Sequence, residues 1–286
     1  MIEIHNEHCK WRIELAKKIS SKIVKMEDVE AIAIGGSVAR GYADEYSDIE
    51  ILILWGELPS EETRKHLISK LCAECLYPFN YDANEDNLII EGIQVDLWHN
   101  TVSCESEVIK SILKSEDMSL GNSNFMDTIS MCIPIYGESI ITKWKEDASR
   151  YPYEYAIYNI EDSLRFLKPG HLELHMYRNN PTLVFNNIIE LQKRMFLLLL
   201  ALNERYFPTY KWMYVSLKEM RNKPQNIAER FQEVFRLPCK EAIEVTFQHI
   251  YEVIELINQL HPEVETELAT KSLVGTRKKL IPRIVD

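Results

Sequence analysis

Two acidic residues stand two positions apart in the stretch GGSVARGYADEYSDIEILI, residues 35–53. Asp48 and Glu50 open an apolar run typical of a strand, and residues i and i+2 of a strand point to the same face. Both carboxylates can therefore be directed at one point in space, where they would repel each other without a cation. Magnesium suits such a pair, because it takes oxygen ligands and completes its shell with substrate phosphates.

A glycine turn precedes the acid pair. Gly35 and Gly36 let the backbone bend sharply and approach a ligand closely, and Ser37 can donate its hydroxyl and cap a short following helix. A helix N-terminus can hold nucleotide phosphates, because its first N–H groups are free. Arg40, just beyond the turn, could reach a phosphate or could lie exposed on the short helix.

A third carboxylate lies further along the chain. Asp96 stands in the apolar segment 93–98, where a lone acid would be costly to bury without a partner or a metal. Three acids on neighbouring strands can hold two metal ions about 4 Å apart and support an in-line displacement at phosphorus. Each feature has a plainer reading, such as a solvated strand end or an exposed edge strand. Together they favour phosphoryl or nucleotidyl transfer.

The elements that must position these residues form a small mixed α/β domain. Branched residues bounded by turn formers predict strands on both sides of the glycine turn, and a Glu-Gly turn predicts a later hairpin. The expected elements are a helix over 6–25, a strand over 29–34, a short helix after Ser37, a strand over 49–55, a helix from 59 to about 75, and strands over 87–90 and 92–98.

After residue 103 the apolar spacing is helical almost to the end. Helices are expected over 104–115, 138–148, 153–168, 181–204, 210–221, 226–235 and 239–259, separated by proline and glycine signals. The loop at 134–137 is the expected boundary. The predicted fold class is therefore α/β (α+β), with a mixed-sheet catalytic domain over 1–135 and an α-helical domain over 136–286.

Composition narrows the function classes. The chain has 286 residues, of which 46% are hydrophobic, as expected of a globular protein with a real core. A net charge of −11 opposes nonspecific binding to nucleic acid and would suit a cationic substrate. The longest apolar run, 195–202, is shorter than the roughly 20 residues of a membrane span. The charged N-terminus lacks a signal peptide, so a cytoplasmic location with reduced cysteines is expected.

The motifs resemble the polymerase-β type nucleotidyltransferase superfamily. Its signature is Gly-Gly or Gly-Ser, then Asp-x-Asp or Asp-x-Glu, then a third acid on a later strand. The similar residues here are Gly35-Gly36-Ser37, Asp48-Ile49-Glu50 and Asp96. The string from Tyr46 to Glu50 is similar to that of kanamycin-type aminoglycoside nucleotidyltransferases. No P-loop, dinucleotide fingerprint or nucleophile elbow competes with this reading.

The resemblance implies a magnesium-dependent transfer of a nucleoside monophosphate from ATP or another NTP to a hydroxyl, with release of pyrophosphate. It implies that Asp48, Glu50 and Asp96 are catalytic and bind two Mg²⁺ ions. Asp96 would complete the metal site or serve as the base. Gly35, Gly36, Ser37, Arg40 and Ser47 would bind the nucleotide. The helical domain would help to hold nucleotide and substrate.

A second string, 203–212, resembles one in uncharacterised bacterial members of the superfamily. Its Lys211 could contact a nucleotide phosphate as a point charge, or could be a solvated lysine at a turn between helices. The family's second-domain Glu-x-x-x-Lys pair has no secure match, which leaves the general base open.

The expected partners are the nucleotide and a small molecule with a hydroxyl group, such as an aminoglycoside-like antibiotic, bound by a monomer or a homodimer. Neither nucleic acid nor a membrane is expected as a partner. Two alternatives remain: modification of a protein or tRNA by a relative of toxin–antitoxin enzymes, and a nucleotide-binding protein without catalysis.

Overall fold

The computed structural model describes residues 6–169 and 172–274 and divides into two compact units, Met1–Arg150 and Tyr151–Asp286. The first unit holds a mixed sheet with helices, and the second is helical in its described part. The predicted fold class is confirmed. Within the described residues, no helix is both long enough and apolar enough to cross a bilayer.

The first unit interleaves helices with short strands. In chain order, its elements are α1 (Glu7–Ile23), β1 (Val29–Ile34), α2 (Gly36–Arg40), β2 (Ile49–Trp55), α3 (Glu61–Leu71), β3 (Glu74–Cys75), β4 (Glu85–Ile90), β5 (Ile93–Thr101), α4 (Val102–Leu113), α5 (Leu120–Met131), β6 (Ile133–Tyr136) and α6 (Glu138–Ala148).

Side-chain caps explain several helix starts. Ser60 accepts a hydrogen bond from the Thr63 N–H at the start of α3, and Thr101 accepts one from the Cys104 N–H at the start of α4. Such caps satisfy backbone donors that have no partner inside the helix. Because Thr101 also ends β5, strand and helix follow each other without a loop.

In the described part of the chain the strands form one six-stranded sheet, in the order β3-β4-β5-β2-β1-β6. The β2–β5 pair is parallel, and the other neighbours are antiparallel. β2 and β5 lie inside the sheet, and β2 is almost continuously apolar, as strands covered on both faces are.

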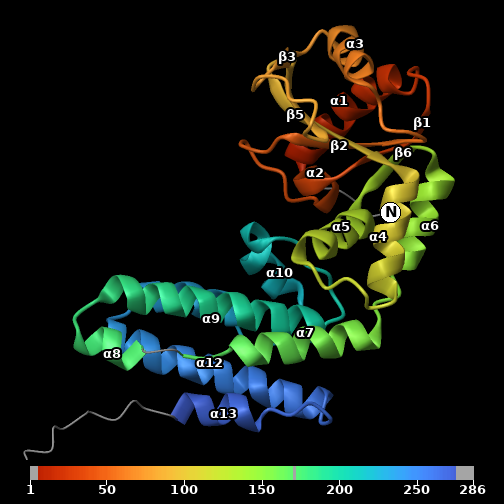
Figure 1. Cartoon of the computed structure of the whole chain (residues 1–286). Helices are drawn as coiled ribbons and strands as arrows, with labels where there is room; N and C mark the ends of the chain where they lie inside the picture. Colours follow the sequence, from red (N-terminus) through yellow and green to blue (C-terminus); the bar gives the residue numbers. More distant parts are fainter. Residues whose placement is uncertain (1–5, 170–171, 275–286) are drawn as a thin grey trace, which may run out of the picture. The chain divides into compact units, whose positions relative to one another are not determined.

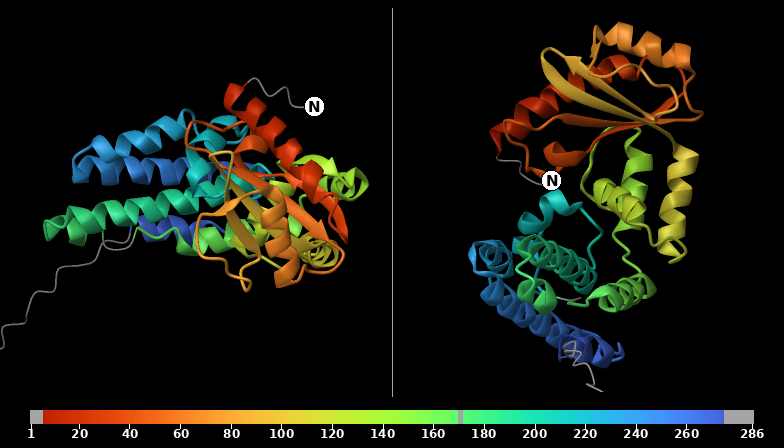
Figure 2. Two further views of the ribbon diagram at one scale, coloured as in Figure 1. Left: turned by 90° about the horizontal axis from the view of Figure 1, so that it is seen from above. Right: turned by 60° about the vertical axis from the view of Figure 1, so that its left-hand side comes forward.

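Helices cover both faces of this sheet (Figures 1 and 2). α1 and α3 pack over the face that carries Ile49, Ile51 and Ile53, and this layer forms the buried core of the unit. α4, α5 and α6 lie on the other side of the sheet. The alternation of side chains along β2 places Glu50 and Leu52 on this second face.

The boundary between the units falls after Arg150, further along the chain than the predicted boundary at 135/136. The segment Ile133–Tyr136, expected as part of a loop, forms edge strand β6 and pairs with β1. α6 follows it and packs against α5. Strand pairing across about a hundred residues is not visible in local sequence, which is why the loop signal placed the boundary too early.

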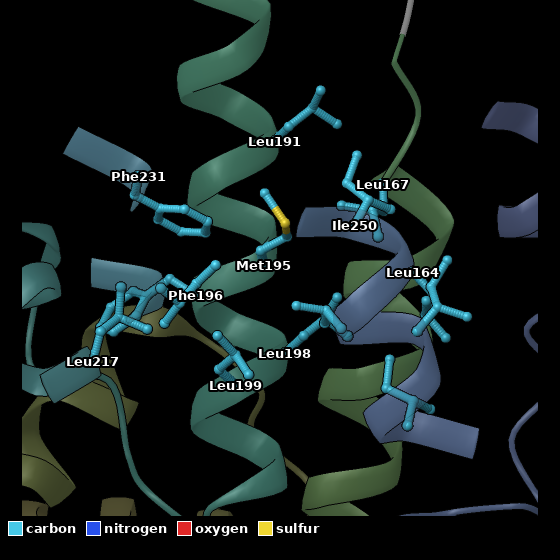
Figure 3. Close-up of a cluster of buried hydrophobic side chains, with 14 of the residues drawn as sticks. Leu164, Leu167, Leu191, Met195, Phe196, Leu198, Leu199, Leu217, Phe231 and Ile250 are labelled. Atoms are coloured by element: carbon cyan, nitrogen blue, oxygen red, sulfur yellow. The ribbon is translucent and has the colours of Figure 1, made fainter. Parts of the chain in front are cut away.

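The second unit is helical throughout its described residues. Its elements are α7 (Tyr153–Phe166), α8 (Leu172–Tyr177), α9 (Pro181–Leu202), η1 (Tyr210–Trp212), α10 (Met213–Glu219), α11 (Ile227–Glu233), η2 (Val234–Arg236), α12 (Cys239–Leu260) and α13 (Glu267–Val274). Helix α9 runs through the middle of the core, where Leu191, Met195, Phe196, Leu198 and Leu199 meet side chains of neighbouring helices (Figure 3).

Candidate functional site

The glycine turn is folded tightly onto the carboxylate of Glu50. Gly36 has φ +59°, which disfavours other residues, and a β-carbon there would lie 0.9 Å from Glu50 Oε2, so a side chain would displace the Glu50 carboxylate. The backbone N–H of Ser37 donates to Glu50 Oε2 at 3.2 Å, and that of Gly35 donates to the Glu50 carbonyl at 2.9 Å. The glycines therefore bring the turn against an acid of the next strand.

Ser37 was expected to cap the short helix, but the structure assigns the N-cap of α2 to Gly35, without a side-chain hydrogen bond. Ser37 lies in the first turn and is 4% exposed. Within the described residues its hydroxyl has no hydrogen-bond partner. A buried hydroxyl without a partner is costly, so a polar ligand group beside Ser37 would satisfy it.

Two of the three predicted acids are direct neighbours across the parallel strands. Glu50 of β2 and Asp96 of β5 are register partners, so their side chains leave the same face of the sheet. Asp48 precedes the first residue of β2 and is partly exposed. The structure thus brings Glu50 and Asp96 together, with Asp48 two residues away along the chain.

Asp96 is 7% exposed, which settles the alternative of an exposed edge position. The side-chain amides of Asn87 and Gln94 donate to its Oδ1 at 3.0 and 3.2 Å, and Gln94 reaches Oδ2 at 3.4 Å. Sequence reasoning missed both amides. Their alternation with Asp96 on the predicted hairpin was the available signal.

The loop that carries Ser47 is tied to α1. Arg12, buried in α1, donates to the Ser47 carbonyl at 2.9 Å, and Asn6 donates to the Ala43 carbonyl at 2.6 Å. The Ser47 hydroxyl exchanges hydrogen bonds with Asp44 inside the loop. Hydrogen bonds from the Tyr46 N–H and from Ser47 hold the pKa of Asp44 below its usual range. Ser47 therefore shapes the loop before Asp48, and its predicted nucleotide contact stays a prediction.

Arg40 is buried and does not lie exposed on the short helix. It is 9% exposed and donates through Nε and Nη2 to Asp127 Oδ2 at 3.0 and 2.5 Å. Nη2 also approaches Thr128 Oγ1 at 3.3 Å. The guanidinium is thus engaged in a buried ion pair with α5, an arrangement that anchors α2. This corrects the alternative of an exposed arginine, and the predicted phosphate contact of Arg40 stays a prediction.

Helix α5 is an element that the sequence reading missed, and it supports the turn directly. A β-carbon at Gly35 would lie 3.3 Å from Thr128 Cγ2 and 2.9 Å from Leu52 Cδ1. The available signal was Ser119, whose side chain caps the helix at Asn122 N–H.

Lys211 lies in the second unit, in η1, where its side chain is exposed and Nζ stands 5.6 Å from the centre of the Trp212 ring. Lys211 belongs to the second unit and the three acids belong to the first, and the phosphate contact of Lys211 stays a prediction.

A buried polar network, also missed from the sequence, holds the opposite face of the sheet. Arg64 donates to Asp86 Oδ1 at 2.6 Å, and His99 Nε2 lies 2.9 Å from Asp86 Oδ2. Trp55 Nε1 donates to His99 Nδ1 at 3.2 Å, which puts the imidazole proton on Nε2. Burial lowers the pKa of His99, so the ring is neutral. Burial opposes ionisation of Asp86, but hydrogen bonds from His99 and Arg64 leave its pKa lowered.

The donor set of the site fits magnesium chemically. Asp48, Glu50 and Asp96 offer only carboxylate oxygens, the ligands that this ion prefers. In the parts of the chain that the structure describes, no three acids, histidines or cysteines are grouped closely enough to enclose an ion by themselves. An ion that arrives with nucleotide phosphates needs only one or two protein carboxylates, so the site suits a metal bound jointly with the nucleotide.

Residues 14–114 match the family model described as a nucleotidyltransferase domain. All predicted site residues except Lys211 lie in this range, and the match supports the wider polymerase-β type resemblance. No curated protein matches the chain.

Two solved structures show partial likeness. A nucleotidyltransferase-like protein from Exiguobacterium sibiricum has 11% identity and a TM-score of 0.42, with 91% of this chain and 77% of the other covered. A CCA-adding enzyme in complex with CTP has 12% identity and a TM-score of 0.33, with 95% and 70% covered. Scores this low carry no argument about substrate. The match of residues 14–114 to this family model, together with the geometry of the acids in that range, supports one conclusion. The chain contains a nucleotidyltransferase domain, and its enzyme class is that of the nucleotidyltransferases.

Proposed function

We propose that the protein transfers a nucleoside monophosphate from ATP or another NTP to a hydroxyl of a small molecule and releases pyrophosphate. The observation that carries the proposal is the pairing of Glu50 with Asp96 on one sheet face, with the Gly36 turn folded against Glu50. Ser37 adds a buried hydroxyl without a partner in the described structure, suited to a phosphate oxygen.

In this proposal Asp48 and Glu50 hold magnesium together with the nucleotide phosphates, and Asp96 completes that site or serves as base. When bound, magnesium would neutralise phosphate charge and polarise the reacting phosphorus, with two ions as the expected complement. The acceptor hydroxyl oxygen forms a bond to the α-phosphorus, its proton passes to a carboxylate, and the bond to the β-phosphate oxygen breaks. Lys211 is proposed as a further phosphate contact from the second unit.

A cationic acceptor is favoured by charge. The protein carries −11 overall, and the loop and strands around the site add Asp44, Glu45 and Glu85 to the three predicted acids. An amino-substituted sugar of the aminoglycoside type offers both ammonium groups and hydroxyls, so it matches this charge and the reaction. Negative potential would also raise the association rate of such a ligand at low salt.

Label transfer tests the proposal. The full chain is incubated with magnesium, each NTP labelled at the α-phosphate, and a panel of aminoglycosides and lincosamides, while pyrophosphate release is measured. We expect label in one acceptor and its loss in Asp48→Ala and Glu50→Ala. Glu62→Gln, which changes an exposed carboxylate in the first turn of α3, is the matched control and should keep activity.

The same assay separates the acceptor classes. Label that enters protein bands or tRNA instead of a small molecule would contradict the proposed acceptor but not the transfer chemistry. Absence of both label transfer and pyrophosphate release, with every acceptor class, would refute the proposed function. Unchanged metal-dependent NTP binding in Asp48→Ala and Glu50→Ala would place the site elsewhere.

A further inference from the structure

The carboxylate of Asp96 is held by neutral amides on its own face of the sheet. Asn87 lies directly across the antiparallel β4–β5 pair from Asp96, and Gln94 precedes Asp96 by two positions in β5. All three side chains therefore leave the same face. Among the ion pairs of the described residues, none engages Asp96, and these amides donate hydrogen bonds to its carboxylate.

The two oxygens of Asp96 are bound unequally. Oδ1 accepts from Asn87 at 3.0 Å and from Gln94 at 3.2 Å, whereas Oδ2 accepts only the longer Gln94 contact at 3.4 Å. Two donors at one oxygen fix the orientation of a carboxylate group. Oδ2 is left as the less engaged oxygen, the one with capacity for a further partner.

The orientation of the Asn87 amide is itself determined. Its Nδ2 donates to Asp96 Oδ1 and, at 2.8 Å, to Glu85 Oε1 on the same strand. A flipped amide would turn its oxygen toward two carboxylates and lose both bonds, so the network specifies the donor. Glu85 thus holds Asn87, and Asn87 in turn holds Asp96.

We propose that Asn87 and Gln94 are positioning residues of the nucleotidyl transfer: they fix Oδ1 of Asp96 and leave Oδ2 for the substrate complex beside Glu50. The inference rests on the proposed function and assigns to two neutral side chains the task of orienting its third carboxylate. Partners that orient a ligating or catalytic group commonly change activity about 10-fold to 100-fold when removed.

Near-isosteric variants that cannot donate test the role. Asn87→Leu and Gln94→Met should each lower kcat about 10-fold to 100-fold, with a much smaller change in the KM for NTP. Gln94→Asn, which keeps an amide on a shorter side chain, should lose less than Gln94→Met. Gln192→Met is the matched control: its amide donates to the Phe231 carbonyl within the second unit, so its loss should not lower kcat in the same way.

A double-mutant cycle separates positioning from general structural support. If Asn87 acts through Asp96, Asn87→Leu should cost far less in an Asp96→Asn background than in the wild type. Additive effects, or unchanged kcat in both Asn87→Leu and Gln94→Met, would overturn the inference. Circular dichroism and thermal unfolding check folding, and Asn87→Ser replaces Asn87→Leu if the latter does not fold.

The proposed function can fail separately. A wild-type protein without transfer to any acceptor would refute that function, but calorimetry with magnesium and a nonhydrolysable NTP needs no acceptor. In that case the same double-mutant cycle is measured as the affinity for the nonhydrolysable NTP. Coupling between Asn87 and Asp96 would support the positioning role, and additive effects would overturn it.

Discussion

At the residue scale, Gly36 sets the geometry of the candidate site. Gly36 has positive φ, and an added β-carbon would lie 0.9 Å from Glu50 Oε2, so a side chain there requires the Glu50 carboxylate to move. The carboxylate occupies the space that a β-carbon would take. The turn and the acid are therefore one packing unit, and neither can change without displacing the other.

Gly36→Ala should abolish most activity. The methyl group would displace the Glu50 carboxylate, and displacement of a reacting group by about 1 Å can cost about 100-fold in rate. Gly41→Ala is the matched control, because Gly41 also has positive φ (+78°) but nothing lies within 4 Å of its added β-carbon. Both variants carry backbone strain of about 1–2 kcal/mol. Equal activity losses in a transfer assay would contradict the packing argument.

Glu105 of α4 predicts a pH dependence of stability. It is 7% exposed, and burial raises its pKa to about 7. The folded protein keeps this proton up to about pH 7, while the unfolded chain releases it near 4.5. Because the unfolded state then binds fewer protons, the free energy of unfolding falls as pH rises between these values.

Glu105→Gln should therefore be more stable than the wild type at pH 8, by up to about 3 kcal/mol, and similar to it near pH 4. The amide is neutral at every pH and does not carry the cost of a buried charge. Urea unfolding at several pH values measures the difference. A difference that does not change with pH would show that ionisation of Glu105 is not the cause.

At the element scale, α5 anchors the short helix α2. Arg40 and Asp127 are both buried and form the ion pair between these helices, with Thr128 adding an acceptor. Breaking a buried pair by removing one partner leaves an uncompensated charge, whereas replacing both partners can be nearly neutral. The Arg40–Asp127 ion pair therefore anchors α2, the short helix that also carries Ser37.

Asp127→Leu alone should lower the free energy of unfolding by about 3–5 kcal/mol. The double variant Arg40→Met/Asp127→Leu should recover much of this loss, because no charge is then left buried. Chemical denaturation of the two single variants and the double variant measures the coupling. Additive losses would show that the pair is not the main interaction between α2 and α5.

At the scale of the whole molecule, the two units have separate hydrophobic cores. The first core needs the full sheet, and β6 completes it by pairing with β1. α6 packs against α5 and β1, and its Ile141 and Trp144 are buried. The folding unit therefore extends through Arg150, beyond the loop signal in the sequence.

A chain ending at residue 150 should fold alone, whereas a chain ending at 135 should not fold cooperatively. The shorter chain cuts β6, leaves the β1 edge unpaired and removes α6 from its packing against α5. Circular dichroism with urea unfolding distinguishes the two. Cooperative unfolding of the shorter chain with the same midpoint would place the boundary at the predicted position.

Periodicity located most elements, because their signals are local. Strands 29–34 and 49–55 and helix 138–148 have the predicted bounds, and the acids Asp48, Glu50 and Asp96 stand on or beside the strands expected for them. Helix α5 was missed because its periodicity is weak and its burial depends on partners distant in sequence. The predicted helix 210–221 begins as the short 3-10 turn η1 before α10, so the difference lies in the first hydrogen bonds of the segment.

The sequence alone determined the residue types of the site: glycines for a close turn, carboxylates two apart on a strand, and a third acid in an apolar segment. These features can be recognised from residues that lie within a few positions of one another in the sequence. Only the tertiary structure decided that Asp96 lies beside Glu50, that Asn87 and Gln94 donate hydrogen bonds to it, and that Arg40 pairs with Asp127. These contacts join residues up to 87 positions apart, and such pairings depend on strand register and helix packing rather than on local pattern.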